Sequence, residues 1–199
     1  MEVRRGTLAK LLAVVFVFNL LVMGAGALYS YEHTPPIPKE VAGPGGETVV
    51  TDAQVREGKT VMQQNGLMNH GSILGNGAYY GVDYTADALR LKTQFMREYY
   101  ADERYGGPYD ALPAEDQAAV DSLVQSDLAD GTVENRIQYS SAELYAHQQV
   151  RDVYVERYHE GARERGVPAD TIDSAAEARR FADFALWTAW ISHTDRPGG

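Results

Sequence analysis

The sequence predicts a mainly α-helical protein, in which one N-terminal transmembrane helix precedes a helical domain with a small β-hairpin. Three observations support this fold class. Residues 11–28 are almost all apolar or small, and Asn19 is the only strongly polar residue among them. Further on, three Ser/Thr capping boxes each precede a segment with apolar residues three or four positions apart, which is typical of helices. The β-prone residues gather in the short stretch 132–139, which we interpret as one strand of the hairpin.

The apolar run is long enough to cross a membrane. Eighteen helical residues span about 27 Å, close to the roughly 30 Å of a bilayer's hydrocarbon core. Three basic residues precede the run: Arg4, Arg5 and Lys10. Since basic residues favour the cytoplasmic side, we expect the N-terminus in the cytoplasm and the remainder outside. Residues 1–30 are therefore interpreted as a basic flank and a membrane anchor.

Two other interpretations of this run are weighed against the anchor. Residues 25–27, Ala-Gly-Ala, resemble a signal-peptide cleavage site. The apolar run is, however, longer than the 7–15 residues usual in a cleaved signal. A buried core helix seldom combines such a run with a basic flank. The anchor is the interpretation that we carry forward.

Composition excludes several classes of partner and bond. The net charge of −10 argues against nucleic acid or anionic lipid as a partner. The chain has no cysteine, so neither a disulfide nor a thioether link to haem can form. A domain of about 150 residues can nevertheless bury a sizeable core.

The chain after the anchor divides into a linker and a domain. Residues 31–50 contain Pro35, Pro36, Pro38 and Pro44, and are interpreted as an extended linker or a segment lying against the domain surface. Residues 51–199 form the domain. Its helices are expected over about 52–64, 85–101, 113–128, from 141 to before Gly166, and 175–190. On the second of these, Arg90, Lys92 and Arg97 are predicted to face water.

The titratable residues predict no catalytic or metal site. None of the five histidines belongs to an HExxH pattern. His147 and His159 lie 12 residues apart on one predicted helix, so they project about 120° apart and some 18 Å along the axis, too far to share a metal. Asp83 and Asp87 are one turn apart, a spacing that suits a general acid and base. We favour the simpler interpretation, in which Asp83 bonds loop backbone and Asp87 stabilises a helix start.

The glycine-rich stretch 66–84 lies between two predicted helices and is the most unusual part of the chain. Its spacing fits neither the GxGxxG nor the GxxxxGK[ST] phosphate-binding pattern. Residues 66–70 instead align with the haem attachment motif C-x-x-C-H. Gly66 and Asn69 stand at the cysteine positions and His70 at the histidine position. The histidine of the motif is therefore present at the expected position, but both cysteines are absent.

The longer stretch 71–89, GSILGNGAYYGVDYTADAL, resembles a signature in the N-terminal region of the large subunit of quinol-dependent nitric oxide reductases. Residues 184–190 and 196–198 resemble the end of the same region. In that family a transmembrane helix leads into an extracytoplasmic cytochrome c-like domain without haem, and the catalytic helical bundle follows. The resemblance implies that quinol supplies the electrons. It also implies that haem b and non-haem iron belong to the catalytic portion, which this chain lacks.

For this chain, the resemblance implies a non-catalytic domain with no cofactor of its own and with a haem pocket filled by bulky side chains. The candidates for that filling are Tyr79, Tyr80, Tyr84, Phe95 and Trp187. The expected partners are membrane lipid, through the anchor, and a separate catalytic polypeptide. By itself the chain should not reduce nitric oxide, and it is either a truncated gene product or one piece of a split enzyme.

Two alternatives stay open from the sequence. In the first, His70 binds haem non-covalently, with Met62, Met68 or Met96 on the opposite face, for electron transfer or gas sensing. In the second, the chain is a tethered module that binds a small ligand outside the membrane.

Overall fold

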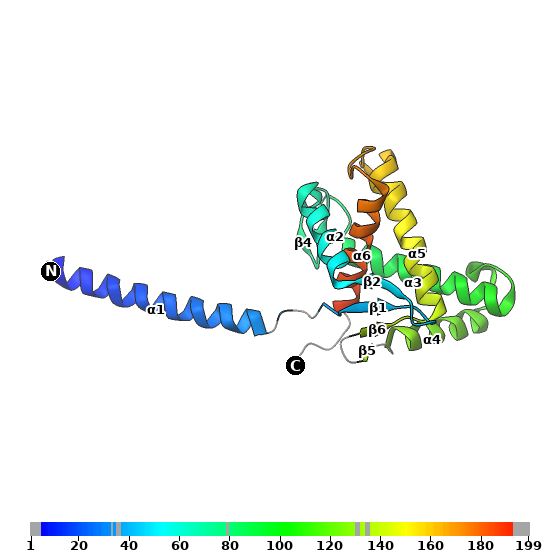
Figure 1. Ribbon diagram of the computed structural model, residues 1–199, viewed down its shortest axis with the longest axis horizontal. Helices are drawn as coiled ribbons and strands as arrows, with labels where there is room; N and C mark the ends of the chain where they lie inside the picture. Colours follow the sequence, from blue (N-terminus) through cyan, green and yellow to red (C-terminus); the bar gives the residue numbers. More distant parts are fainter. Residues whose placement is uncertain are drawn as a thin grey trace. The chain divides into compact units, whose positions relative to one another are not determined.

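The computed structural model describes residues 5–32, 34, 37–78, 80–129, 132–133 and 136–192. The chain separates into two compact units, Met1–Pro36 with Asp195–Gly199, and Ile37–Thr194. Helices dominate both units and the strands are few and short, as Figure 1 shows, so the predicted mainly α class is confirmed. Arg4, His33, Pro35, Pro36, Tyr79 and residues 193–199, to which the sequence analysis also refers, lie outside the described residues.

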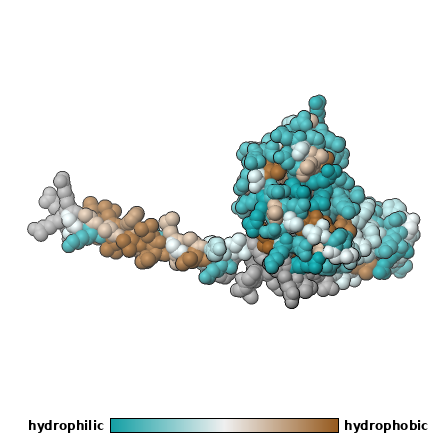
Figure 2. Space-filling view, viewed as in Figure 1, coloured by the Kyte–Doolittle hydropathy of each residue, from teal (hydrophilic) through white to brown (hydrophobic). Residues whose placement is uncertain are grey.

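The first unit contains one long apolar helix, α1 (Arg5–Glu32). Residues Gly6–Glu32 have the length and composition of a membrane span: an 18-residue window within them has a mean hydropathy of 2.5, and every described side chain on α1 is exposed. Its surface is hydrophobic through the middle of the helix in Figure 2. The amide of Asn19 donates to the carbonyl of Val15 at 2.9 Å, so this polar group is satisfied within the helix, as a lipid environment requires.

The second unit contains the five helices that the sequence predicts, α2 to α6. They are α2 (Asp52–Gln64), α3 (Tyr84–Tyr105), α4 (Ala114–Ala129), α5 (Ser141–Val155) and α6 (Ala175–Ile191). Shorter helical turns follow some of them: η1 (Leu67–Asn69), η2 (Tyr109–Ala111), the π-helical η3 (Glu156–Gly161) and η4 (Arg163–Arg165). The capping boxes at Thr51 and Ser140 form with both reciprocal bonds. Ser174 caps α6 by accepting from the Glu177 amide at 3.2 Å.

A small sheet brings distant segments together in the order β2-β1-β6-β5. Its strands are β1 (Glu40–Ala42), β2 (Thr48–Thr51), β5 (Thr132–Val133) and β6 (Arg136–Gln138). The stretch 132–139 therefore contributes two paired strands instead of the single one that we interpreted. A separate pair, β3 (Ser72–Ile73) and β4 (Asn76–Gly77), lies in the glycine-rich stretch.

Residues 37–50 differ from a free linker. The compact unit begins at Ile37, and β1 and β2 pair antiparallel within it. Val41 and Val50 are buried in the core. Proline and glycine suggested a linker here, but Pro44 and Gly46 lie in the turn between the two strands, where Gly46 has a φ of 83°. The alternative interpretation, a segment lying against the domain, comes closer to the structure.

Helices α2 and α6 approach each other very closely at Gly58. A Cβ atom built on Gly58 would lie 1.9 Å from the carbonyl oxygen of Arg180 and 2.8 Å from the Cβ of Phe184. Only glycine permits two helix backbones to come this near at that point. The position of α6 against α2, visible side by side in Figure 1, therefore depends on this residue.

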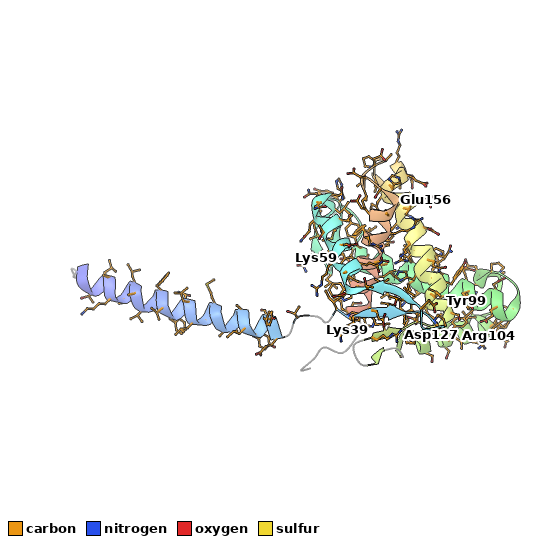
Figure 3. All side chains as sticks on the ribbon, viewed as in Figure 1. Lys39, Lys59, Tyr99, Arg104, Asp127 and Glu156 are labelled. Carbon is orange, nitrogen blue, oxygen red and sulfur yellow. The ribbon has the colours of Figure 1, made fainter. Side chains whose placement is uncertain are left out.

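Helix α4 packs on α3 and α5 through a second, smaller core. Met96, Val124, Ala142 and Ala146 form its buried part. Beside it, the carboxylate of Asp127 accepts from the Tyr100 hydroxyl and the Ser140 hydroxyl, both at 2.6 Å. Asp127 is labelled in Figure 3, close to the junction of these helices. One acidic residue of α4 thus connects α3 with the first residue before α5.

The prediction that Lys92 faces water is wrong. Its side chain is buried, its ammonium group lies 2.6 Å from the Glu143 carboxylate, and the same group is 4.5 Å from the centre of the Tyr139 ring. Burial lowers the pKa of Lys92, but the Glu143 carboxylate opposes this effect through its charge and its hydrogen bond, and the net pKa is raised. The helical periodicity of the sequence predicted an exposed Lys92. A local pattern of this kind contains no information about an ion-pair partner 51 residues away in the chain.

Candidate functional site: the cleft beside His70

Asp83 organises the glycine-rich stretch 66–84. Its carboxylate accepts from the Ser72 hydroxyl and the Gly75 amide, each at 2.7 Å, and from the Ala86 amide at 3.0 Å as the N-cap of α3. Burial raises the pKa of Asp83, but these hydrogen bonds outweigh that effect and lower it. The predicted bonds between Asp83 and the backbone of the loop are therefore confirmed.

The glycines of this stretch allow other parts of the chain to pack closely against its backbone. A Cβ on Gly81 would lie 1.5 Å from the His70 carbonyl oxygen, and one on Gly71 would lie 2.5 Å from the Tyr84 ring. Gly66 follows α2 with a φ of 63°, a left-handed conformation that favours glycine. These contacts fold the loop back on itself and place His70 at its surface, where the side chain is exposed.

Four aromatic rings fill the interior next to this loop. Tyr84, Tyr154, Tyr158 and Phe181 are all buried, and five of their pairs have ring centres 5.1 to 6.1 Å apart in edge-on or tilted contact. Of the side chains predicted to fill a haem pocket, Tyr84 is buried in this cluster. Tyr80 is fully exposed and fills no interior space. Phe95 and Trp187 are only partly buried at the edge of the core.

A cleft opens beside these rings, between the loop and the turns that follow α5. Its volume is about 50 Å³. Leu67, Val82, Tyr84, Val167 and Pro168 supply apolar walls, and His70, Arg157, Tyr158 and Arg165 supply polar groups. Sequence reasoning singled out only His70 and Tyr84 of this group for a site. The others follow α5 closely in sequence, but no spacing rule connects them with a histidine that lies before α3.

The residues around His70 do not fit a haem. An engineered cavity of about 150 Å³ holds a benzene molecule, so a cleft of about 50 Å³ cannot admit a porphyrin. The four rings occupy the interior behind it, and no methionine lines it among the described residues. Met96, one of the expected axial ligands, lies in the separate core beneath α4. We therefore derive no haem chemistry at His70.

A buried ionic network lies on the other side of α6. The Asp183 carboxylate accepts from His147 Nε2 at 2.9 Å and from the Arg151 guanidinium through two bonds of 2.7 and 2.9 Å. Burial raises the pKa of Asp183, but these two partners outweigh it and lower the pKa. Burial also lowers the pKa of His147, so the imidazole is neutral while Asp183 and Arg151 carry the charges.

This arrangement predicts a pH dependence of stability. An unfolded histidine takes up a proton near its ordinary pKa of about 6.5, whereas His147 in the folded unit does so only at lower pH. The unfolded state therefore binds more protons below about pH 6.5, and the free energy of unfolding decreases as the pH falls. Urea unfolding of the full chain in mild detergent between pH 8 and 5 measures this effect. His147→Gln should remove part of the slope, and equal slopes in both proteins would contradict the assignment.

Within the described residues, no group of three His, Cys, Asp or Glu side chains is placed to bind a metal ion. His147 and His159 are separated as expected, since one is in the buried network and the other bonds the Ile172 carbonyl at 3.1 Å. Asp87, the second residue of the candidate acid–base pair, forms ion pairs with Arg90 and Arg157 instead.

The comparison with protein families decides the relationship. The family model of the NorB cytochrome c-like domain of nitric oxide reductase matches residues 38–199. The chain belongs to this family. A comparison with curated proteins finds no match. The matched range coincides closely with the second unit, so in this NorB domain the strands β1 and β2 belong to the family fold. The apolar helix α1 precedes the domain, as the sequence resemblance implies.

Proposed function

We propose that the chain forms a haem-free extracytoplasmic domain of a quinol-dependent nitric oxide reductase, anchored by α1 and covering the catalytic membrane portion. The observation that carries this proposal is the combination of the family match over residues 38–199 with an interior filled by aromatic side chains beside the cysteine-free stretch 66–70. The domain does not carry electrons, and it contributes no catalytic residue to the reduction of nitric oxide to nitrous oxide.

Physical reasons support this assignment of roles. Electrons from quinol arrive within the membrane, so an outer domain has no need of a redox centre. The catalytic haem b and non-haem iron belong to the membrane portion, whether that portion is joined to this chain or assembled with it. The acidic surface supports a position away from anionic lipid, and α1 supplies the attachment.

The absence of cysteine permits a direct test of orientation. Thr7→Cys places one thiol at the start of α1, and Ser122→Cys places one on the exposed side of α4. With a membrane-impermeant maleimide applied to intact cells, Ser122→Cys should be labelled and Thr7→Cys should be labelled only after lysis. Labelling of Thr7→Cys alone in intact cells would place the domain in the cytoplasm and contradict the proposal.

A further inference from the structure

We propose that the cleft beside His70 binds a single carboxylate group. The central residue is Arg157, whose residue surface is only 9% exposed although its guanidinium is charged. Among the described residues, its one hydrogen bond goes from Nη1 to Asp87. Its other guanidinium nitrogens have no partner among those residues and are not fully buried, and Arg157 is one of the residues that line the cleft. A buried guanidinium with unused donors is a suitable partner for a planar oxyanion.

Tyr158 supplies a second donor at the same place. The residue is 4% exposed, and its hydroxyl has no hydrogen-bond partner among the described residues. That hydroxyl is not fully buried either, and Tyr158 is one of the residues that line the cleft. Burial raises the pKa of Tyr158, and the phenol therefore stays protonated and can donate a hydrogen bond. The other hydroxyl on this wall, that of Tyr84, is already used, because it donates to the Leu67 carbonyl at 2.9 Å.

Charge at the mouth of the cleft favours the same ligand. Arg165 on η4 lines the cleft and supplies an exposed positive charge, and the exposed His70 lines the cleft as a further polar group. Asp87 faces Arg157 but is neutralised by Arg90 at 2.8 Å as well as by Arg157 itself. Asp170 lies near His159, 3.8 Å from its ring nitrogen, and does not line the cleft. In a chain with a net charge of −10, this cleft is a local concentration of positive charge.

Size and walls restrict the ligand further. One water molecule needs about 10–15 Å³ of cavity volume measured in this way, so a cleft of about 50 Å³ admits a group of a few heavy atoms. Apolar walls from Leu67, Val82 and Val167 suit the carbon next to a carboxylate better than a phosphate with its additional oxygens. The group would come either from a free small carboxylate or from an acidic side chain of the catalytic portion.

Titration of the full chain in mild detergent tests the site. The chain is labelled with ¹³C in its histidine rings, His70→Gln assigns the His70 signal, and sodium acetate is added at constant pH and ionic strength against sodium chloride. Acetate should shift the His70 signal saturably. Tyr158→Phe, which removes one hydrogen bond to a charged group, should weaken acetate binding about tenfold or more. Arg165→Gln should weaken it roughly threefold or more, with a smaller effect at high salt.

Arg163→Gln is the matched control, because Arg163 is an exposed arginine of the same turn η4 that does not line the cleft. It should leave acetate binding unchanged. Equal shifts with acetate and chloride, or equal losses in Arg163→Gln and Arg165→Gln, would overturn the proposal. These two arginines are exposed, so this comparison holds even if Tyr158→Phe fails to fold. Glutamate blocked at its amino and α-carboxyl groups distinguishes the sources: binding as tight as that of acetate indicates a side chain, and binding of acetate alone indicates a free anion.

Discussion

Gly58→Ala should destabilise the helical unit by about 2–3 kcal/mol, although alanine is the better helix former. Helix propensity alone would favour alanine by about 1 kcal/mol. The new methyl group would, however, lie 1.9 Å from the Arg180 carbonyl oxygen and 2.8 Å from Phe184 Cβ, so α6 would have to move away from α2. Overpacking a tight contact of this kind typically costs about 1–3 kcal/mol, and occasionally more.

Urea unfolding of the full chain in mild detergent measures this effect. Tryptophan fluorescence is a direct probe, since both tryptophans, Trp187 and Trp190, lie on α6. Lys59→Ala is the control, because Lys59 is the exposed neighbour of Gly58 on α2 and is labelled in Figure 3. That control should change stability by less than about 0.5 kcal/mol. An increase in stability for Gly58→Ala would show that the two helices do not approach as described.

Asp183→Ala should have a still larger effect, about 3–5 kcal/mol. The substitution removes the only carboxylate that pairs with both His147 and Arg151 among the described residues, and it leaves the Arg151 charge without that partner in the interior. Arg180 loses a bond of 3.3 Å to the same group. Asp183→Asn should lose less, because the amide oxygen still accepts one hydrogen bond.

The melting temperatures of these variants and of the unaltered chain show whether the loss of stability comes from the buried network or from the loss of any one negative charge. Asp152→Ala is the matched control, since Asp152 is an exposed aspartate on the surface of α5 with a single distant ion pair to Arg179 at 3.7 Å. Its melting temperature should stay close to that of the unaltered chain. If Asp183→Ala melted at the temperature of Asp152→Ala, the buried network would contribute little to the fold.

Local signals in the sequence predicted the helices well. The box of Thr51 and Gln54 and that of Ser140 and Glu143 located two helix starts to the residue, because each signal is complete within four positions. Lys92 was misplaced because its burial depends on Glu143, on another helix. The sheet was incompletely predicted for the same reason: β1 is paired with β6, which comes much later in the chain.

The candidate site was predicted even less completely. His70 was identified because it stands at the histidine position of the haem attachment motif. Tyr84 was identified as one of the bulky residues expected to fill a haem pocket. Arg157 and Tyr158 belong to no motif. Among the residues that the structure describes, Arg157 bonds only Asp87 and the Tyr158 hydroxyl has no partner, although both residues line the cleft. A hydrogen-bond donor that has no partner in the folded protein cannot be recognised from the sequence, because its possible partners come from distant segments.

The central claim is that this member of the NorB domain family is a haem-free part of a nitric oxide reductase. The most direct test isolates the chain from its native membrane in mild detergent with an antibody against residues 80–190, then records its mass, its visible spectrum and its consumption of nitric oxide. We predict that haem b and nitric oxide consumption accompany the isolated material, and that His70→Ala leaves its haem spectrum unchanged. A Soret band on this chain in the absence of a catalytic portion, lost in His70→Ala, would contradict the account.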